Sequence, residues 1–139
     1  MEIIIKRLNY STKGTNDLID ISSDVQSELN KLKITEGLVN IFVVGSTAAI
    51  TMFEYESGLI SDIRQVYENI APEKKHYLHN ETWNDANGFS HIRSALQGQG
   101  LSVPFQNSKL LSGTWQQIVL AEFDTRPRQR DLVLTFIGQ

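Results

Sequence analysis

All three histidines of the chain lie in one short segment, residues 76–91. Histidine is the side chain whose ordinary pKa lies closest to neutrality, and its neutral ring is the commonest protein ligand for transition metals. The segment has no regular apolar period, which predicts a long loop or a short-helix region, and such loops are often functional. The alternative is that its polar side chains serve turn formation alone. These side chains are His76, His79, His91, Glu81, Asp85, Asn80, Asn84 and Asn87, joined by the aromatic Trp83.

The spacing of His79 and His91 does not match an ordered metal motif. There is no HExxH sequence and no pair of histidines at i, i+4 spacing, so the two rings can share an ion only if the chain between them folds back. The chain contains no cysteine, so a metal would need imidazole, carboxylate or water ligands.

A second group of candidate residues is the arginine-rich turn 126–130, Arg-Pro-Arg-Gln-Arg. Guanidinium groups bind phosphate and carboxylate through paired hydrogen bonds, so this turn is a candidate anion site. The alternatives are a solvated hairpin turn or an ion pair between subunits. No GxxxxGK[ST] phosphate loop and no GxSxG nucleophile motif occurs elsewhere in the chain.

A third group surrounds the break between two apolar stretches, residues 38–44 and 48–53. Gly45-Ser46-Thr47 interrupts them, and the small side chains here permit close approach of a ligand or, alternatively, tight packing of another backbone. Glu54 directly follows the second stretch. A carboxylate at the end of a buried strand often faces a site.

The elements that would position these residues predict an α+β fold. Runs of strands without regular βαβ alternation favour mainly antiparallel sheets that close into a sandwich or barrel, and 139 residues suit one domain, 1–139. A capping-box spacing from Ser23 to Gln26 predicts the start of the first helix. We expect helices at 23–33, 58–70 and 90–96, and strands at 2–8, 18–21, 38–44, 48–53, 101–105, 109–111, 115–123 and 132–137.

Composition excludes several classes of protein. A formal net charge of −3 argues against a nucleic-acid binder, which needs a basic face to neutralise phosphates. No apolar run approaches the roughly 18 residues of a membrane-spanning helix, and the first residues do not form a signal peptide. We therefore expect a cytoplasmic protein with neither a nucleic-acid nor a membrane partner.

Several segments together resemble the YjbQ-like family, whose members are often described as secondary thiamine-phosphate synthases. The resemblance runs from about residue 20 to residue 138, and its most specific part is the block Leu-Ser-Gly-Thr-Trp-Gln-Gln-Ile at 111–118. The other matching segments are 45–50, 54–56, Asp62, 77–79, 87–94 and Gly98.

The resemblance implies a β-barrel-like core with two to three helices, assembled as a homotrimer. It also implies an active site in which His79 and His91 serve catalysis and bind a divalent metal, Zn or Mg, with Glu54 beside them as a catalytic carboxylate. The implied reaction joins a pyrimidine diphosphate to a thiazole phosphate. Candidate residues for binding the phosphorylated small molecule are Ser46, Thr47, Asn87, Trp115, Gln116, Arg126 and Arg130.

One position departs from the family pattern. Many members have a histidine where this chain has Gly45. If that histidine completes a three-histidine metal site, this chain supplies only two of the three rings, and Glu54, Asp85 or water must fill the remaining positions. The departure leaves open a second function, a non-catalytic trimer that binds an anion or metabolite.

Overall fold

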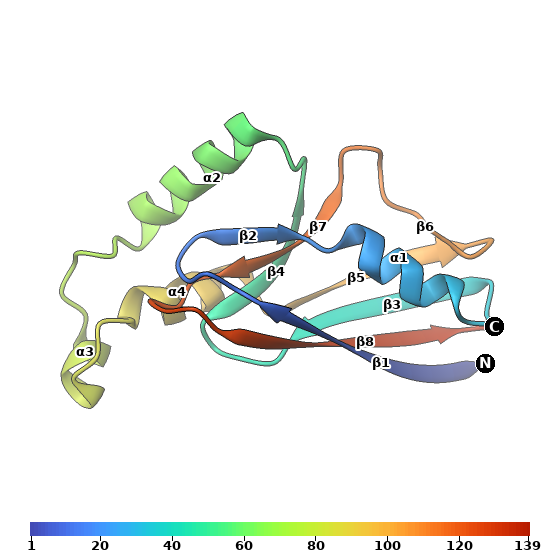
Figure 1. Ribbon diagram of the computed structural model, residues 1–139, viewed down its shortest axis with the longest axis horizontal. Coiled ribbons are helices and arrows are strands. Elements are labelled where there is room, and N and C mark those ends of the chain that lie inside the picture. Colours follow the sequence, from blue (N-terminus) through green and yellow to red (C-terminus); the bar gives the residue numbers. More distant parts are fainter.

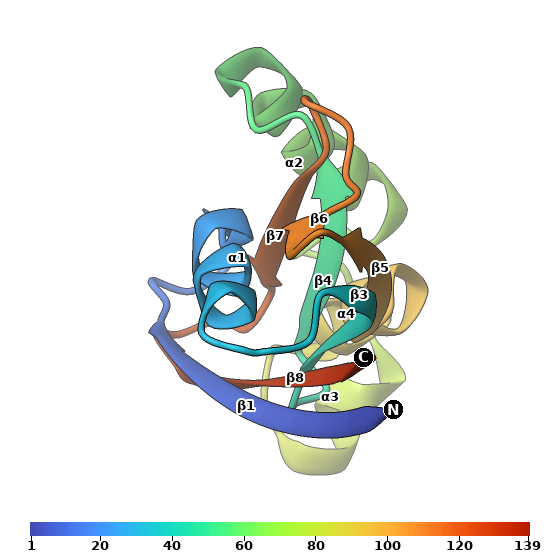
Figure 2. The ribbon, with the colours of Figure 1, turned by 90° about the vertical axis from the view of Figure 1, so that its right-hand side faces the viewer.

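The computed structural model describes residues 1–139 and has two antiparallel sheets. In the five-stranded sheet the order is β1 (Glu2–Ser11), β8 (Gln129–Gly138), β3 (Glu36–Val43), β5 (Gly100–Gln106) and β6 (Lys109–Leu110). In the three-stranded sheet it is β2 (Asp17–Asp20), β7 (Gln117–Glu122) and β4 (Ala48–Phe53). The larger sheet curls around the core as a half-barrel, which is clearest in Figure 2. The predicted α+β class with antiparallel sheets is confirmed.

The main core lies between the two sheets and contains 16 buried residues. Strands β3 and β8 alternate buried and more exposed residues, as expected for strands with one face on the core. Helix α1 (Ser22–Asn30) contributes Val25 and Leu29 to the same core.

Strand β7 is buried on both faces, which agrees with its lack of strict apolar–polar alternation. Its Ile118 and Leu120 face the main core, whereas Val119 and Ala121 belong to a second cluster with Tyr67. Tyr67 comes from α2 (Ser57–Ile70), which lies across the outer side of the three-stranded sheet (Figure 1).

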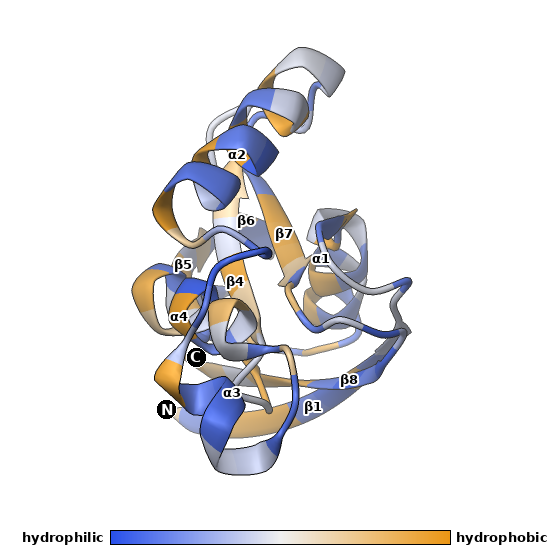
Figure 3. Ribbon diagram, turned by 90° about the vertical axis from the view of Figure 1, so that its left-hand side faces the viewer, coloured by the Kyte–Doolittle hydropathy of each residue, from blue (hydrophilic) through white to orange (hydrophobic).

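The chain has four helices, against the two to three expected. The additional one is α3 (Leu78–Trp83), inside the histidine segment, and it is followed by α4 (Gly88–Gln97). Helix α3 buries no residue and ends at Asn84 in a left-handed conformation, φ 52°. Its ribbon is mostly hydrophilic, while β4 and β7 are strongly hydrophobic (Figure 3). So short and polar a helix has no apolar stripe by which a sequence could reveal it.

Two local predictions were wrong. Helix α1 begins one residue earlier than expected, without a side-chain cap, because Gln26 instead bonds to the backbone of Ser108 and Leu110. The strand expected from residue 115 begins at Gln117, and Trp115 lies in the turn before it with 69% of its surface exposed. No helix is both long enough and apolar enough to cross a membrane.

Candidate functional site

His79 on α3 and His91 on α4 lie in contact. Their ring centroids are 4.4 Å apart and the ring planes are inclined by 42°. The chain between them therefore does fold back, and it brings together the two histidines that the sequence singled out. His76 lies apart on the surface, where its Nε2 is 3.2 Å from Glu81 and 69% of its side chain is exposed.

The absence of a side chain at Gly88 allows this approach. An added Cβ would lie 2.7 Å from the Cβ of Tyr77 and 2.8 Å from Oδ1 of Asn80. The backbone N–H of Gly88 also donates to Oδ1 of Asn80 at 2.9 Å. Because α4 begins directly against residues 77–80, His91, one turn later, reaches His79.

Arg93 fixes the other side of α4. Its side chain is almost fully buried, and its guanidinium donates to the carbonyl oxygen of Ala71, to Glu68 and to Oδ1 of Asn16. The guanidinium also stacks over the ring of Phe89. These bonds join α4 to the end of α2 and to the loop before β2, so Arg93 positions α4 and does not contact the histidine pair.

The Nδ1 atom of His79 is buried and makes no hydrogen bond. It lies 3.5 Å from Oδ1 of Asp85, close enough for electrostatic attraction but without hydrogen-bond geometry. Asn87 lies beside the same carboxylate; with its amide nitrogen facing Asp85, it donates at 3.0 and 3.2 Å. A buried nitrogen without a partner is rare in native proteins and marks a position where a ligand can bind.

Burial lowers the pKa of His91 below its ordinary value of 6.5, and the neighbouring His79 lowers it further. The carboxylates of Asp124 and Asp85 act in the opposite direction but do not outweigh these effects. His91 is therefore neutral near pH 7, the form in which imidazole accepts a proton or ligates a metal.

Beside the histidines lies a buried group of charged and hydroxyl side chains. Glu122 and Arg130, both at most 3% exposed, form a paired contact in which Nε and Nη2 of Arg130 donate to the carboxylate at 2.7 and 2.5 Å. Thr47 Oγ1 accepts from Nη2 of Arg130 at 2.7 Å and lies 3.3 Å from Asp124. The loop after β3 and the turn before β8 therefore meet at the end of the molecule where α4 begins (Figure 1).

Asp124 joins this group to the histidines. Burial alone would raise its pKa, but the backbone N–H of Thr125 and the guanidinium of Arg128 outweigh burial and hold the pKa below 3.8. Asp124 is thus ionised at neutral pH, between the arginines and His91.

The structure gathers some of the predicted residues and separates others. Ser46, Thr47, Asn87 and Arg130 lie at the histidine end, whereas Arg126 is exposed in the turn against Gly14. The predicted grouping of all three turn arginines is not observed. Arg130 is buried on Glu122, and Arg128 bonds to Asp124 at 2.7 Å.

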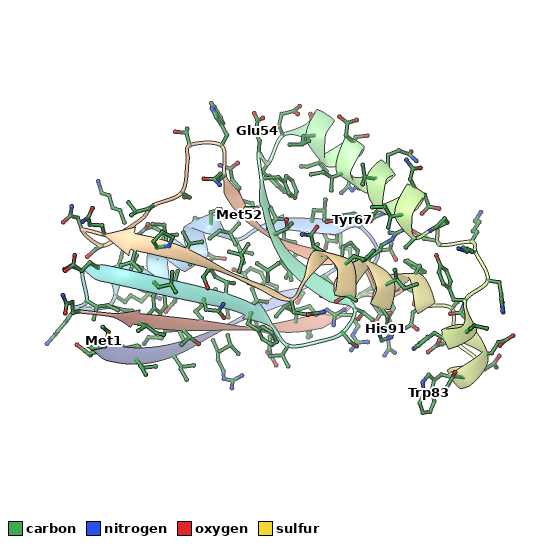
Figure 4. All side chains as sticks on the ribbon, turned by 180° about the vertical axis from the view of Figure 1, so that it is seen from behind. Met1, Met52, Glu54, Tyr67, Trp83 and His91 are labelled. Carbon is green, nitrogen blue, oxygen red and sulfur yellow. The ribbon has the colours of Figure 1, made fainter.

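Glu54 lies at the other end of β4, as Figure 4 shows by the separation of its label from that of His91. The strand has six residues, which span roughly 20 Å at about 3.3 Å each, so one chain does not bring Glu54 beside the histidine pair as expected. Glu54 instead lines an open cavity of about 360 Å³ with Trp115. The other lining residues are Asp20, Tyr55, Glu56 and Gln117. Gln116 accepts from the backbone of Gly113 at 2.7 Å and shapes the turn.

Metal ligands are only partly assembled in the chain. No group of three His, Cys, Asp or Glu side chains is arranged to hold an ion. The two touching imidazoles and the orphaned Nδ1 of His79 nevertheless fit a borderline divalent ion such as Zn²⁺, with Asp85 as the nearest carboxylate. They fit Mg²⁺ poorly, because that ion prefers oxygen ligands.

Sequence reasoning missed Glu122 and Asp124 as members of this site. The signal was present, because both acidic residues lie where a buried strand ends, the same criterion that singled out Glu54. What the sequence did not show is that the arginine turn folds back over these carboxylates.

A family model described as UPF0047 protein YjbQ-like matches residues 6–139. The chain belongs to the YjbQ-like UPF0047 family. The resemblance drawn from the sequence is confirmed. A UPF0047 protein of Methanothermobacter thermautotrophicus is 38% identical over 139 residues, which span 100% of this chain and 95% of the relative.

Solved structures of YjbQ-like proteins share the fold. A YbjQ-like protein of unknown function from Sulfolobus solfataricus superposes with a TM-score of 0.89 at 28% identity, over 99% of this chain and 100% of that one. An uncharacterised YjbQ/UPF0047 protein from Clostridium acetobutylicum gives 0.81 at 31% identity, over 94% and 99%. The UPF0047 family thus supplies a fold without an assigned activity.

Proposed function

We propose that the His79–His91 pair is the centre of a site that binds a divalent transition metal and a small phosphorylated molecule. The observation that carries the proposal is the contact between the two rings at 4.4 Å, with a buried Nδ1 on His79 that has no partner. Two imidazoles in contact, one of them with a buried nitrogen that has no partner, are costly to arrange unless they share a ligand or a proton.

Each residue has a distinct role in this proposal. His79 and His91 would hold the ion, and Asp85, whose Oδ1 lies 3.5 Å from Nδ1 of His79, would be the carboxylate beside it. When bound, the ion would stabilise negative charge on phosphate oxygens as a Lewis acid. His91, neutral near pH 7, is also placed to accept a proton from a bound molecule.

The reaction that suits this site is transfer of a pyrimidinylmethyl group. The carbon–oxygen bond to the diphosphate breaks, pyrophosphate leaves with the electron pair, and the thiazole nitrogen forms a new bond to the carbon. Catalysis of this kind requires stabilisation of the departing charge. Arg130 and Ser46 would serve the phosphate end, and the proposed activity is of the thiamine-phosphate synthase type.

The first experiment is the metal content of the purified chain after incubation with Zn²⁺ and removal of excess ion. We expect near-stoichiometric zinc in the wild type and in His76→Ala, whose ring lies on the surface. His79→Ala and His91→Ala should each lose most of it. Equal zinc in all four proteins, or none in the wild type, would contradict the metal site.

The second experiment measures pyrophosphate release from the pyrimidine diphosphate in the presence of the thiazole phosphate. His91→Ala should abolish pyrophosphate release without changing the thermal unfolding midpoint by more than a few degrees. His76→Ala should release pyrophosphate at the wild-type rate. Undiminished release by folded His91→Ala would remove His91 from the mechanism.

A second candidate function is binding without chemistry. Two observations favour it: no third protein ligand is arranged for an ion, and the carboxylate of Glu54 lies at the far end of β4. It predicts heat on titration of the phosphorylated molecule with no product in the same sample afterwards. Product formation that depends on His91 would decide for the enzyme.

The proposal includes assembly into a homotrimer. The outer face of the five-stranded sheet carries a row of exposed apolar residues aligned across neighbouring strands: Ile3, Ile137, Leu38 and Pro104. Ile3 is 71% exposed, and exposed apolar rows of this kind are typical of subunit contacts. Association is also one way for Glu54 of one copy to approach the histidines of another. Light scattering on the purified protein measures its molar mass in solution, and the mass of a monomer would exclude the homotrimer.

A further inference from the structure

Arg130 has hydrogen-bond donors that the chain does not use. A guanidinium has five N–H groups. In Arg130, Nε donates to Glu122, and Nη2 donates to Glu122 and to Thr47. Nη1 makes no hydrogen bond, although the side chain is only 3% exposed. Nη1 is not fully enclosed, so water or a ligand can reach it and complete its hydrogen bonds.

Nη1 faces the position where Gly45 lacks a side chain. A Cβ on Gly45 would lie 2.8 Å from Nη1, and the only other atom within 4 Å outside residues 44–46 would be Cζ of the same guanidinium. The space beside Nη1 is therefore open, and it remains so because residue 45 is glycine. Gly45 also has φ +155°, a backbone conformation that other residues rarely adopt.

The loop around this space supplies further donors. Gly45 and Ser46 are exposed, and their backbone N–H groups donate no hydrogen bond within the chain. The hydroxyl of Ser46 is likewise without a partner in the chain, whereas that of Thr47 is already engaged by Arg130 and Asp124. The loop therefore has unused N–H and O–H donors at residues 45 and 46, next in the chain to the open space at Gly45.

The negative charge of Glu122 does not prevent an anion from binding at Nη1 of Arg130. Glu122 is bonded to the Nε and Nη2 edge of the guanidinium, and Thr12 donates a further hydrogen bond to it at 2.7 Å. Nη1 is on the other side of Cζ. A guanidinium held on one edge by a carboxylate is pre-oriented on its free edge, so little side-chain entropy is lost when an anion binds there.

We propose that Nη1 of Arg130, the backbone N–H groups of Gly45 and Ser46, and the Ser46 hydroxyl form a subsite for a phosphoryl group. The subsite rests on the proposed function, because it places the phosphate of the small molecule next to the histidine site. Asp124 connects the two: it contacts Thr47, and its charge acts on His91. The lack of a side chain at Gly45 thus leaves one edge of the Arg130 guanidinium open.

The test is a calorimetric titration of the full chain, freed of metal by a chelator, with inorganic pyrophosphate. Gly45→Ala places a methyl group against Nη1, and Ser46→Asp adds a negative charge at an exposed position. Both should weaken binding roughly 10- to 100-fold, as expected for loss of hydrogen bonds to a charged ligand. Ser27→Asp, which adds the same charge on the exposed side of α1, is the control and should bind like the wild type.

Thermal unfolding of each variant separates binding from folding. If Gly45→Ala is unstable because of its backbone conformation, Ser46→Asp alone carries the test. Pyrophosphate binding that is equal in Ser46→Asp and Ser27→Asp, or absent from the wild type at millimolar ligand, would overturn the subsite.

The subsite and the metal site can fail separately. Retained pyrophosphate binding in His79→Ala, together with its loss in Ser46→Asp, supports the subsite even if the wild type holds no zinc. The opposite result is that zinc is lost only in the histidine variants, while Ser46→Asp binds pyrophosphate like the wild type. That result supports the metal site and removes the subsite.

Discussion

The two ends of β4 carry the two groups of polar residues that the sequence singled out, and they differ in almost every physical respect. At the Ala48 end, the charged side chains are buried, paired and bonded to one another, and the histidine rings touch. At the Phe53 end, Glu54 and Trp115 line an open cavity and are largely exposed. Pre-organised groups inside a low-dielectric site interact strongly, whereas exposed groups are screened by water. Within one chain, the histidine end is therefore the better candidate for chemistry.

The largest expected difference between the two ends is in stability. Glu122→Ala leaves Arg130 buried without its carboxylate and should lower the free energy of unfolding by about 3–5 kcal/mol. Glu54→Ala, at the exposed end, should change it by no more than about 0.5 kcal/mol. Chemical denaturation of both variants measures this. Comparable losses of unfolding free energy in the two variants would show that Glu54 also makes contacts that stabilise the fold.

Next in size is the effect of a methyl group at the start of α4. Gly88→Ala places a Cβ 2.7 Å from that of Tyr77, so the helix must shift, at a cost of about 1–3 kcal/mol. The shift should separate the histidine rings and reduce zinc retention. Ala86→Ser, an exposed change in the same loop, is the control. Wild-type zinc content in Gly88→Ala would show that the close packing of α4 does not position His91.

A smaller effect is expected from pH. His91 has a lower pKa in the folded chain than in the unfolded chain, so the unfolded state binds more protons as the pH falls through about 6.5. Stability should therefore decrease between pH 7 and pH 5.5, above the range in which Asp124 titrates. His91→Asn should flatten this dependence, and His76→Asn should keep it. An unchanged slope in His91→Asn would assign the dependence to other groups.

The smallest effect is expected at Trp115. Because this side chain is 69% exposed, Trp115→Ala should change stability by less than about 0.5 kcal/mol and leave zinc retention unchanged. Light scattering on the same variant tests whether Trp115 takes part in a contact between subunits. Loss of a trimer that the wild type forms would assign Trp115 to a subunit contact instead of a pocket within one chain.

Much of the fold was predictable because its signals are local. The apolar stripe of α2, the double burial of β7 and the break at Gly45 between β3 and β4 all follow from short-range patterns. Helix α3 was missed because it has six residues and buries none of them. The start of α1 was misplaced because Gln26 bonds to a strand more than 80 residues away and not to its own helix end.

The sequence by itself determined the family, the α+β class and the two histidines worth testing, since residue types and their order suffice for those conclusions. Only the tertiary structure decided which residues act together. It joined His79 to His91 through the close packing at Gly88, separated Glu54 from both by the length of β4, and buried Arg130 on Glu122 beneath Gly45. The physical reason is that these relations depend on contacts between segments distant in the chain, and no local pattern encodes the distance between two side chains that meet only after folding.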